Sequence, residues 1–179
     1  MHILSRLALK NMKRGNFLIA IPLLLVGMAF TYFSNVVTAS KSECSVNSVY
    51  DGDTMRLSCN GEKTKVRLYC IDTPEMKQKP WGRESRDYLR SITPQKVKLV
   101  RHTKDRYGRI VAEVLNGEIN LNQEMVHSGY AAVYEKYCEK PIYSELERQA
   151  KSDKRGIWAK PGLHQQPWQW RKQQRKKKN

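Results

Sequence analysis

The sequence has little of what proteins use to bind zinc. Its four cysteines include no Cys-x-x-Cys pair, the spacing typical of structural zinc sites. The histidines His102, His127 and His164 are scattered, and no two of them stand at metal-ligand spacing. We therefore expect no four-cysteine zinc site, and we interpret these histidines as solvated surface residues. The sequence also shows no internal repeat, so a repeat architecture is not expected.

Acidic side chains are scarce too. The 179 residues include 33 Lys and Arg but only 17 Asp and Glu, which gives a formal net charge of +16. Six basic residues cluster near the C-terminus: Arg171, Lys172, Arg175, Lys176, Lys177 and Lys178. A run of this kind is usually a solvated, disordered tail. Its charge would attract a polyanion such as DNA, RNA or an anionic lipid surface.

The one long apolar stretch runs from Phe17 to Phe33. Basic residues precede it and Val37-Thr38-Ala39 follows, a pattern suited to signal-peptide cleavage after Ala39. The alternative is an uncleaved membrane anchor formed by the same stretch, which is near the lower limit for spanning a bilayer. Either way we expect an exported domain, periplasmic or secreted. The predicted organisation is a leader at 1–39, a folded domain at 40–163 and a Trp-containing basic tail at 164–179.

All four cysteines lie beyond the predicted cleavage point. An even number in an exported domain indicates two disulfides, for which three pairings are possible. If Asp51-Gly52 forms the tip of a two-residue hairpin, Cys44 and Cys59 face each other across the strands. The predicted bonds are therefore Cys44–Cys59 and Cys70–Cys138.

Alternation and turn signals predict an α+β, mainly β domain. Two hairpin turns, Asp51-Gly52 and Asn60-Gly61, join three strands, the last of which is expected to end at Asp72. A helix, two more strands and two further helices follow, in that order. This order fits a five-stranded barrel with helices packed on it, as in an OB-fold. The expected segments are strands at 46–50, 53–59, 62–72, 97–101 and 110–115, and helices at 80–92, 120–129 and 142–150.

Two acids extend the apolar rows of separate predicted strands. Asp53 shares its parity with Met55 and Leu57, and Asp72 shares its parity with Val66 and Leu68. A carboxylate at the end of a core-facing row is costly unless a positive charge meets it. A hard cation bound by oxygen ligands would offset that cost. Calcium fits better than zinc, because no histidine is close in the sequence.

A charged turn, Asp105-Arg106-Tyr107-Gly108-Arg109, lies between the fourth and fifth predicted strands. Arginine is suited to bidentate contact with phosphate. Three acids and two arginines thus fall at strand ends or turns, which is the minimum apparatus for metal-assisted phosphodiester hydrolysis. These residues are Asp53, Asp72, Glu75, Arg67 and Arg109.

Three stretches closely resemble the motifs of the staphylococcal nuclease (thermonuclease) family. They are residues 49–54, 67–75 and 105–109, and Gly156-Ile157-Trp158 matches as well. The resemblance covers about Cys44 to Trp158. It implies an OB-fold barrel with three helices. It also implies cleavage of DNA and RNA with little sequence preference, leaving 3′-phosphate ends.

The resemblance implies a role for each residue of the set. One calcium ion would be held by the carboxylates of Asp53 and Asp72 and by the backbone carbonyl of Thr73. Glu75 would orient or deprotonate the attacking water. Further side chains would bind phosphates of the substrate: Arg67 and Arg109 the scissile one, Arg106 and Tyr107 its neighbour.

A non-catalytic, single-stranded nucleic-acid-binding OB-fold is the alternative function. Such a binder would be expected to lose an acid or an arginine of the set, and this chain retains all of them. The sequence implies DNA and RNA as substrates and no protein partner, and we expect a monomer. Membrane contact is expected only if the N-terminal segment stays uncleaved.

Overall fold

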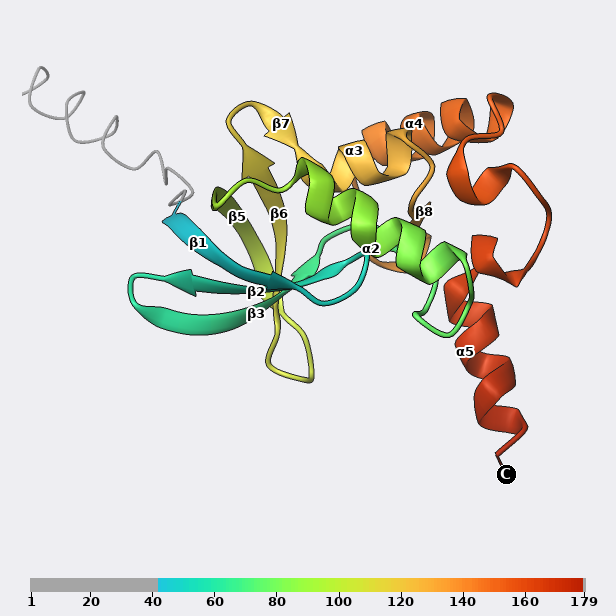
Figure 1. Ribbon diagram of the computed structural model, residues 1–179, viewed down its shortest axis with the longest axis horizontal. Coiled ribbons are helices and arrows are strands. Elements are labelled where there is room, and N and C mark those ends of the chain that lie inside the picture. The colour runs from blue at the N-terminus through green and yellow to red at the C-terminus, as the bar shows by residue number, and fades with distance from the viewer. Residues whose placement is uncertain (1–41, 179) are drawn as a thin grey trace, which may run out of the picture. The chain divides into compact units, whose positions relative to one another are not determined.

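The computed structural model describes residues 42–178, and its centre is a closed β-barrel (Figure 1). Neighbouring strands follow the order β3-β2-β1-β5-β6, and parallel pairing of β3 with β6 closes the ring. The five-stranded barrel predicted from the sequence is therefore confirmed. Its strands are β1 (Ser42–Val49), β2 (Thr54–Cys59), β3 (Glu62–Leu68), β5 (Lys96–Lys104) and β6 (Ile110–Asn116).

The barrel core is filled by one face of each strand. Met55, Leu57, Val66 and Leu99 are buried, whereas their chain neighbours Arg56, Lys65 and Lys98 are exposed. This alternation is the period-two pattern that predicted the strands. The three short strands outside the barrel are β4 (Ile71–Asp72), β7 (Ile119–Asn120) and β8 (Ala132–Val133).

Three helices pack in sequence beside the barrel, with α3 in contact with both α2 and α4 (Figure 1). Asn120 begins α3 by accepting hydrogen bonds from the backbone N–H groups of Asn122 and Gln123, as the capping pattern predicts. A fourth helix, α5, lies in the predicted tail. The helices are α2 (Trp81–Ile92), α3 (Leu121–His127), α4 (Pro141–Ser152) and α5 (Pro167–Lys176).

None of the helices within residues 42–178 is long and apolar enough to cross a membrane. The predicted leader, residues 1–39, lies outside the described residues.

The first hairpin differs from its prediction by one residue at the tip. Val49 lies opposite Met55, and the N–H of Tyr50 donates to the carbonyl of Thr54 (2.9 Å), so the tip has three residues instead of the predicted two. The side chain of Asp51 accepts a hydrogen bond from the backbone N–H of Asp53 (3.1 Å), which stabilises the wider turn. Gly52 is required there, because a Cβ would lie 2.8 Å from Ser85 and Thr73.

A β-bulge in β1 compensates for the longer tip. The register shifts between Val46 and Ser48, where β1 carries one extra residue. Cys44 is therefore still opposite Cys59, and the second hairpin at Asn60-Gly61 has the predicted two-residue tip. The prediction of the turn was wrong by one residue, and the bulge restored the cysteine register.

The predicted third strand does not run unbroken to Asp72. β3 ends at Leu68, and Cys70 takes the left-handed conformation with φ 68°. The chain then leaves the barrel and forms β4, which pairs with β8 instead. Two contacts of Cys70 fix this break: its carbonyl accepts the N–H of Tyr134 (2.8 Å), and its sulfur is bonded to Cys138.

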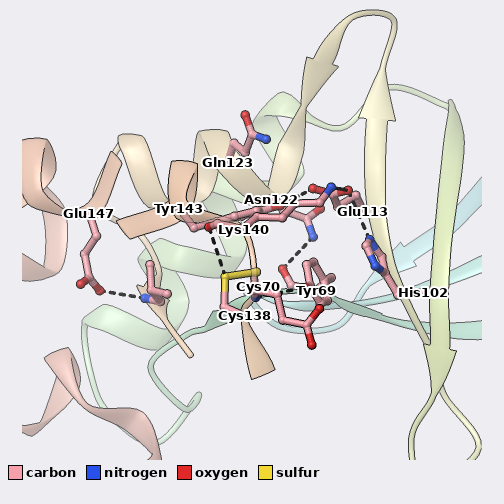
Figure 2. The surroundings of a disulfide bond; sticks show 12 residues. Tyr69, Cys70, His102, Glu113, Asn122, Gln123, Cys138, Lys140, Tyr143 and Glu147 are labelled. Carbon is pink, nitrogen blue, oxygen red and sulfur yellow. Dashed lines mark hydrogen bonds and ion pairs between the residues drawn. A yellow bond between two sulfur atoms is a disulfide. The ribbon is translucent and has the colours of Figure 1, made fainter. Parts of the chain in front are cut away.

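Both predicted disulfides are confirmed. Cys44–Cys59 joins β1 to β2, and Cys70–Cys138 joins the turn after β3 to the segment before α4. Figure 2 shows the second bond beside the ring of Tyr69. The turn that presents Asp72 is therefore held covalently to the helical part of the domain.

Polar groups beside this disulfide form a satisfied network (Figure 2). Glu113 accepts hydrogen bonds from Tyr143 (2.8 Å) and Lys140 (2.5 Å), and its Oε2 lies 3.2 Å from His102 Nε2. Asn122 donates to the carbonyls of Tyr69 and Ala112, each at 3.0 Å. The cost of burying these groups is offset because each has a partner.

The prediction of solvated histidines was wrong for His164. This residue is buried, and its ring stacks on Trp81 with centroids 4.2 Å apart. Its Nε2 lies 2.9 Å from the carbonyl oxygen of Ile157. An aromatic partner and a carbonyl together compensate for the loss of water, and no local sequence pattern indicates either.

Removing the two disulfides separately should destabilise the domain to different extents. The Cys70–Cys138 bond closes a loop of sequence separation 68 and the Cys44–Cys59 bond a loop of 15. Loop-closure entropy predicts losses of roughly 4 and 3 kcal/mol, respectively. Chemical denaturation of the Cys70→Ser/Cys138→Ser and Cys44→Ser/Cys59→Ser variants measures both. A larger loss for the shorter loop would contradict the entropic ranking.

Candidate active site

Two buried carboxylates, Asp53 just before β2 and Asp72 in β4, meet at one guanidinium. Arg67 Nη1 lies 2.5 Å from Asp53 Oδ2, and Nη2 lies 2.9 Å from Asp72 Oδ1. The side chain of Asp72 is fully buried and that of Asp53 is 9% exposed. β3 places Arg67 directly beside Thr54 of β2, so the pairing of the barrel strands brings these groups together.

Asp53 is also held by hydroxyl and backbone donors. The backbone N–H and the hydroxyl of Thr73 donate to Asp53 Oδ2 at 3.0 and 3.1 Å. The hydroxyl of Thr54 donates to Oδ1 at 3.1 Å. The carboxylate orientation is therefore fixed by its neighbours on β2 and after β4.

Glu75 stands at the edge of this group with its side chain 37% exposed. Its backbone N–H donates to the side chain of Gln78 (2.9 Å), and its carbonyl accepts the N–H of Gln78 (2.7 Å). Gly82 lies against this carbonyl so closely that any Cβ would overlap it. The loop is thus rigidly placed, while the carboxylate itself can be reached by water.

An arginine from the predicted tail completes the cluster. Arg171 of α5 donates to Asp72 Oδ2 at 2.8 Å, to Asp72 Oδ1 at 3.1 Å and to Glu75 Oε1 at 2.9 Å. The prediction of a solvated, disordered run from Arg171 to Lys178 was therefore wrong for residues 171–176, which are helical. Pro167 at the first helical position and the absence of glycine over the next eleven residues were the available signals for a helix.

Asp51 is a further acid beside the site. Burial raises the pKa of Asp51 to about 7, and the negative charge of Asp53 contributes to the increase. Burial also raises the pKa of Asp72, although Arg67 opposes this. Burial therefore disfavours the charged form of both carboxyl groups. The hairpin interpretation treated Asp51 only as a turn residue and missed its place in the cluster.

Asp105 organises the loop between β5 and β6. It accepts the N–H of Tyr107 (2.9 Å), the N–H of Arg109 (3.0 Å) and Nε of Arg109 (2.7 Å). Burial alone would raise its pKa, but the hydrogen bonds from Arg109 and the loop backbone hold the pKa of Asp105 below its ordinary value. Tyr107 is 70% exposed, and the guanidinium of Arg106 lies 4.9 Å from the centre of its ring.

Arg109 directly precedes β6, the strand that pairs with the strand of Arg67. In the parallel pairing of β3 with β6, Arg67 lies beside Val111, and Arg109 precedes Val111 by two residues. Among residues 42–178, no hydrogen bond or ion pair joins Arg109 to the three carboxylates; it pairs with Asp105, so the structure does not bring it into the cluster.

Residues 65–160 match the family model described as staphylococcal nuclease homologue. The chain belongs to this family. An uncharacterized endonuclease of Haemophilus influenzae is 38% identical over 150 residues, 83% of each chain. One from Escherichia coli is 38% identical over 141 residues, 78% of this chain and 91% of its own. A probable staphylococcal-like nuclease of rice, CAN3, is 34% identical over 125 residues, 66% of this chain and 33% of its own.

The oxygen donors of this staphylococcal nuclease homologue suit a hard cation. Within residues 42–178, no group of three or more His, Cys, Asp or Glu side chains is arranged to hold a metal ion. A cation between Asp53 and Asp72 would therefore need backbone carbonyl and water ligands as well. Calcium is commonly bound by such mixed oxygen sets. In the structure, Arg67 forms ion pairs with both carboxylates, and Arg171 forms a further ion pair with Asp72.

Loss of Arg67 should destabilise the fold strongly. Arg67→Ala would leave two buried carboxylates short of a partner, which typically costs about 3 kcal/mol or more. The matched control is Arg109→Ala, because Arg109 pairs with Asp105 nearer the surface and its loss should cost about 1 kcal/mol or less. Urea denaturation in the presence of a chelator measures both. Equal losses would show that Arg67 does not stabilise the acids as proposed.

Proposed function

We propose that the chain is an exported, calcium-dependent nuclease that hydrolyses phosphodiester bonds in DNA and RNA. The convergence of Asp53 and Asp72 on Arg67, with Glu75 at the rim, is the observation that supports this most directly. Membership of the staphylococcal nuclease homologue family supports the same activity.

Asp53, Asp72 and the backbone carbonyl of Thr73 would hold one calcium ion. All three donors are oxygens, which favours calcium over zinc. The ion would supply a fixed positive charge beside a phosphate oxygen. Asp53 is already oriented by the Thr73 and Thr54 hydroxyls, so little side-chain freedom would be lost on binding.

Glu75 is the proposed general base. Its partly exposed carboxylate takes a proton from a water molecule, and the water oxygen attacks phosphorus. The bond from phosphorus to the 5′-oxygen breaks, and this oxygen leaves with a proton from solvent, so a 3′-phosphate remains. Arg67 and Arg109 donate to the phosphate oxygens and stabilise the added negative charge.

The loop after β5 supplies the proposed contacts to the neighbouring phosphate. Arg106 and Tyr107 project from it, and Tyr107 is among the most exposed large side chains of the described residues. Contacts to phosphates carry no sequence information. We therefore expect little sequence preference and cleavage of both nucleic acids.

A non-catalytic nucleic-acid-binding module is the second candidate. One observation favours it: Arg171 pairs with Asp72 and Glu75, the proposed ligand and base. A binder would keep this arrangement permanently, whereas a nuclease must release it. The two functions therefore differ in whether the cluster becomes available to substrate.

Cleavage of plasmid DNA and of RNA should require calcium and Glu75. We expect cleavage with calcium, none with a chelator, and a rate at least about 100-fold lower for Glu75→Gln, because the amide cannot accept the proton. Glu118→Gln, at an exposed turn residue, is the matched control and should keep the wild-type rate. The Arg67→Lys variant should also lack activity, because an ammonium group lacks the planar fork of a guanidinium. Nucleic-acid binding without cleavage by the wild-type chain would support the second candidate instead.

Export is proposed because the domain has two disulfides, and such bonds form and persist mainly in oxidising compartments. The predicted leader would be removed after Ala39. Intact-mass measurement of the chain expressed in a bacterial host should give a mature product beginning at Ser40. A full-length chain in the membrane fraction would show that residues 17–33 act as an anchor.

A further inference from the structure

We propose that Arg171 competes with the cation for the carboxylate of Asp72. Nucleic acid bound to the basic residues of α5 would draw Arg171 away from this carboxylate. This inference rests on the proposed nuclease function. It goes further by assigning a role in that function to a helix beyond the family match, which ends at residue 160.

Arg171 occupies the oxygens that a cation would need. Asp72 Oδ2 accepts from Arg171 at 2.8 Å, and Asp72 Oδ1 accepts from both Arg67 and Arg171. The same guanidinium also reaches Glu75 (2.9 Å). Asp72 is fully buried, so it has no further surface to offer a cation. A cation at Asp72 would therefore compete with Arg171 for the same carboxylate.

Apart from the ion pairs of Arg171 itself, the helix that carries this residue is attached at its start. Pro167 is buried, and Trp168 stacks on Tyr134 with ring centroids 5.7 Å apart. The remaining residues of α5 are largely exposed, and Figure 1 shows the helix extending away from the barrel. A segment with few buried contacts opens at low cost in free energy. Release of Arg171 therefore needs no rearrangement of the barrel.

The exposed part of α5 is entirely basic in its charge. It carries no acid, and no ion pair within residues 42–178 involves any basic residue after Arg171. Arg175 lies one turn after Arg171 and shares its face of the helix. A phosphodiester chain entering the site would therefore meet α5 on the side that covers the carboxylates. The basic residues after Arg171 are Lys172, Arg175, Lys176, Lys177 and Lys178.

Phosphate is the chemistry that can replace the carboxylates as partner of Arg171. A guanidinium binds phosphate and carboxylate with the same bidentate geometry. Nucleic acid on α5 would thus free Asp72 for the cation, and cation on Asp72 would free Arg171 for nucleic acid. Because such coupling is reciprocal, each ligand should strengthen the binding of the other.

Calcium binding by the full mature chain tests the competition without relying on cleavage. Isothermal titration should show that Arg171→Gln binds calcium about tenfold more tightly than the wild type, within the usual range for coupled sites. Lys172→Gln is the matched control, since it removes the same charge from an exposed neighbour with no ion pair, and should change the affinity less than twofold. Arg171→Lys keeps the charge but loses the planar fork, so its calcium affinity should lie between those of the wild type and Arg171→Gln.

Thermal unfolding gives a second measurement on the same proteins. In chelator, Arg171→Gln should unfold at a lower temperature than the wild type, because Asp72 loses one of its two cationic partners. Added calcium should raise its unfolding temperature by more than it raises that of the wild type. A phosphorothioate oligothymidylate, as a cleavage-resistant probe, should tighten calcium binding to the wild type but not to Arg171→Gln.

Each contrary result overturns a defined part of the inference. Equal calcium affinities of wild type and Arg171→Gln would overturn the competition while leaving the proposed nuclease intact. Absence of calcium binding in every variant would overturn the proposed cation site and the competition together. If anionic phospholipid vesicles tighten calcium binding and the oligonucleotide does not, nucleic acid is not the partner of α5.

Discussion

The ion pairs of Arg67 with Asp53 and Asp72 are the constraint on which the site depends. Two carboxylates removed from water repel each other and resist ionisation unless a positive charge lies between them. Arg67 meets this need from the strand next to Asp53. The fork of a guanidinium also fixes the two acids relative to each other, which a single point charge could not do. The arrangement is therefore preformed before any cation or substrate arrives.

The rest of the fold positions β3 and β4, which carry Arg67 and Asp72, and β2, which follows Asp53. Pairing of β3 with β6 closes the barrel, and the Asp105 loop directly precedes β6. The Cys70–Cys138 bond and the buried Asn122 fix the turn through which the chain passes from β3 to β4. Because this turn redirects the backbone, Asp72 meets Arg67 from outside the barrel instead of extending its strand.

The same electrostatic requirement explains the C-terminal helix. Burial raises the pKa of Asp51 and of Asp72, so an ionised carboxylate at either position needs a positive charge beside it. Arg171 supplies the second positive charge from α5. The carboxylates that suit a cation also suit a guanidinium, so a basic segment of the same chain can occupy the site.

Local pattern determined most of the barrel, and it marked the acids and arginines of the candidate site. Alternation marked the strands, Asn60-Gly61 marked its turn, and the acid and arginine set was complete in the sequence. Tertiary structure alone decided the break at Cys70, the burial of His164 and the return of Arg171 to Asp72. These depend on contacts between residues far apart in the chain, and periodicity reports only on near neighbours. A carboxylate's need for a positive charge can be inferred from sequence, but which arginine supplies it is settled only when the chain folds.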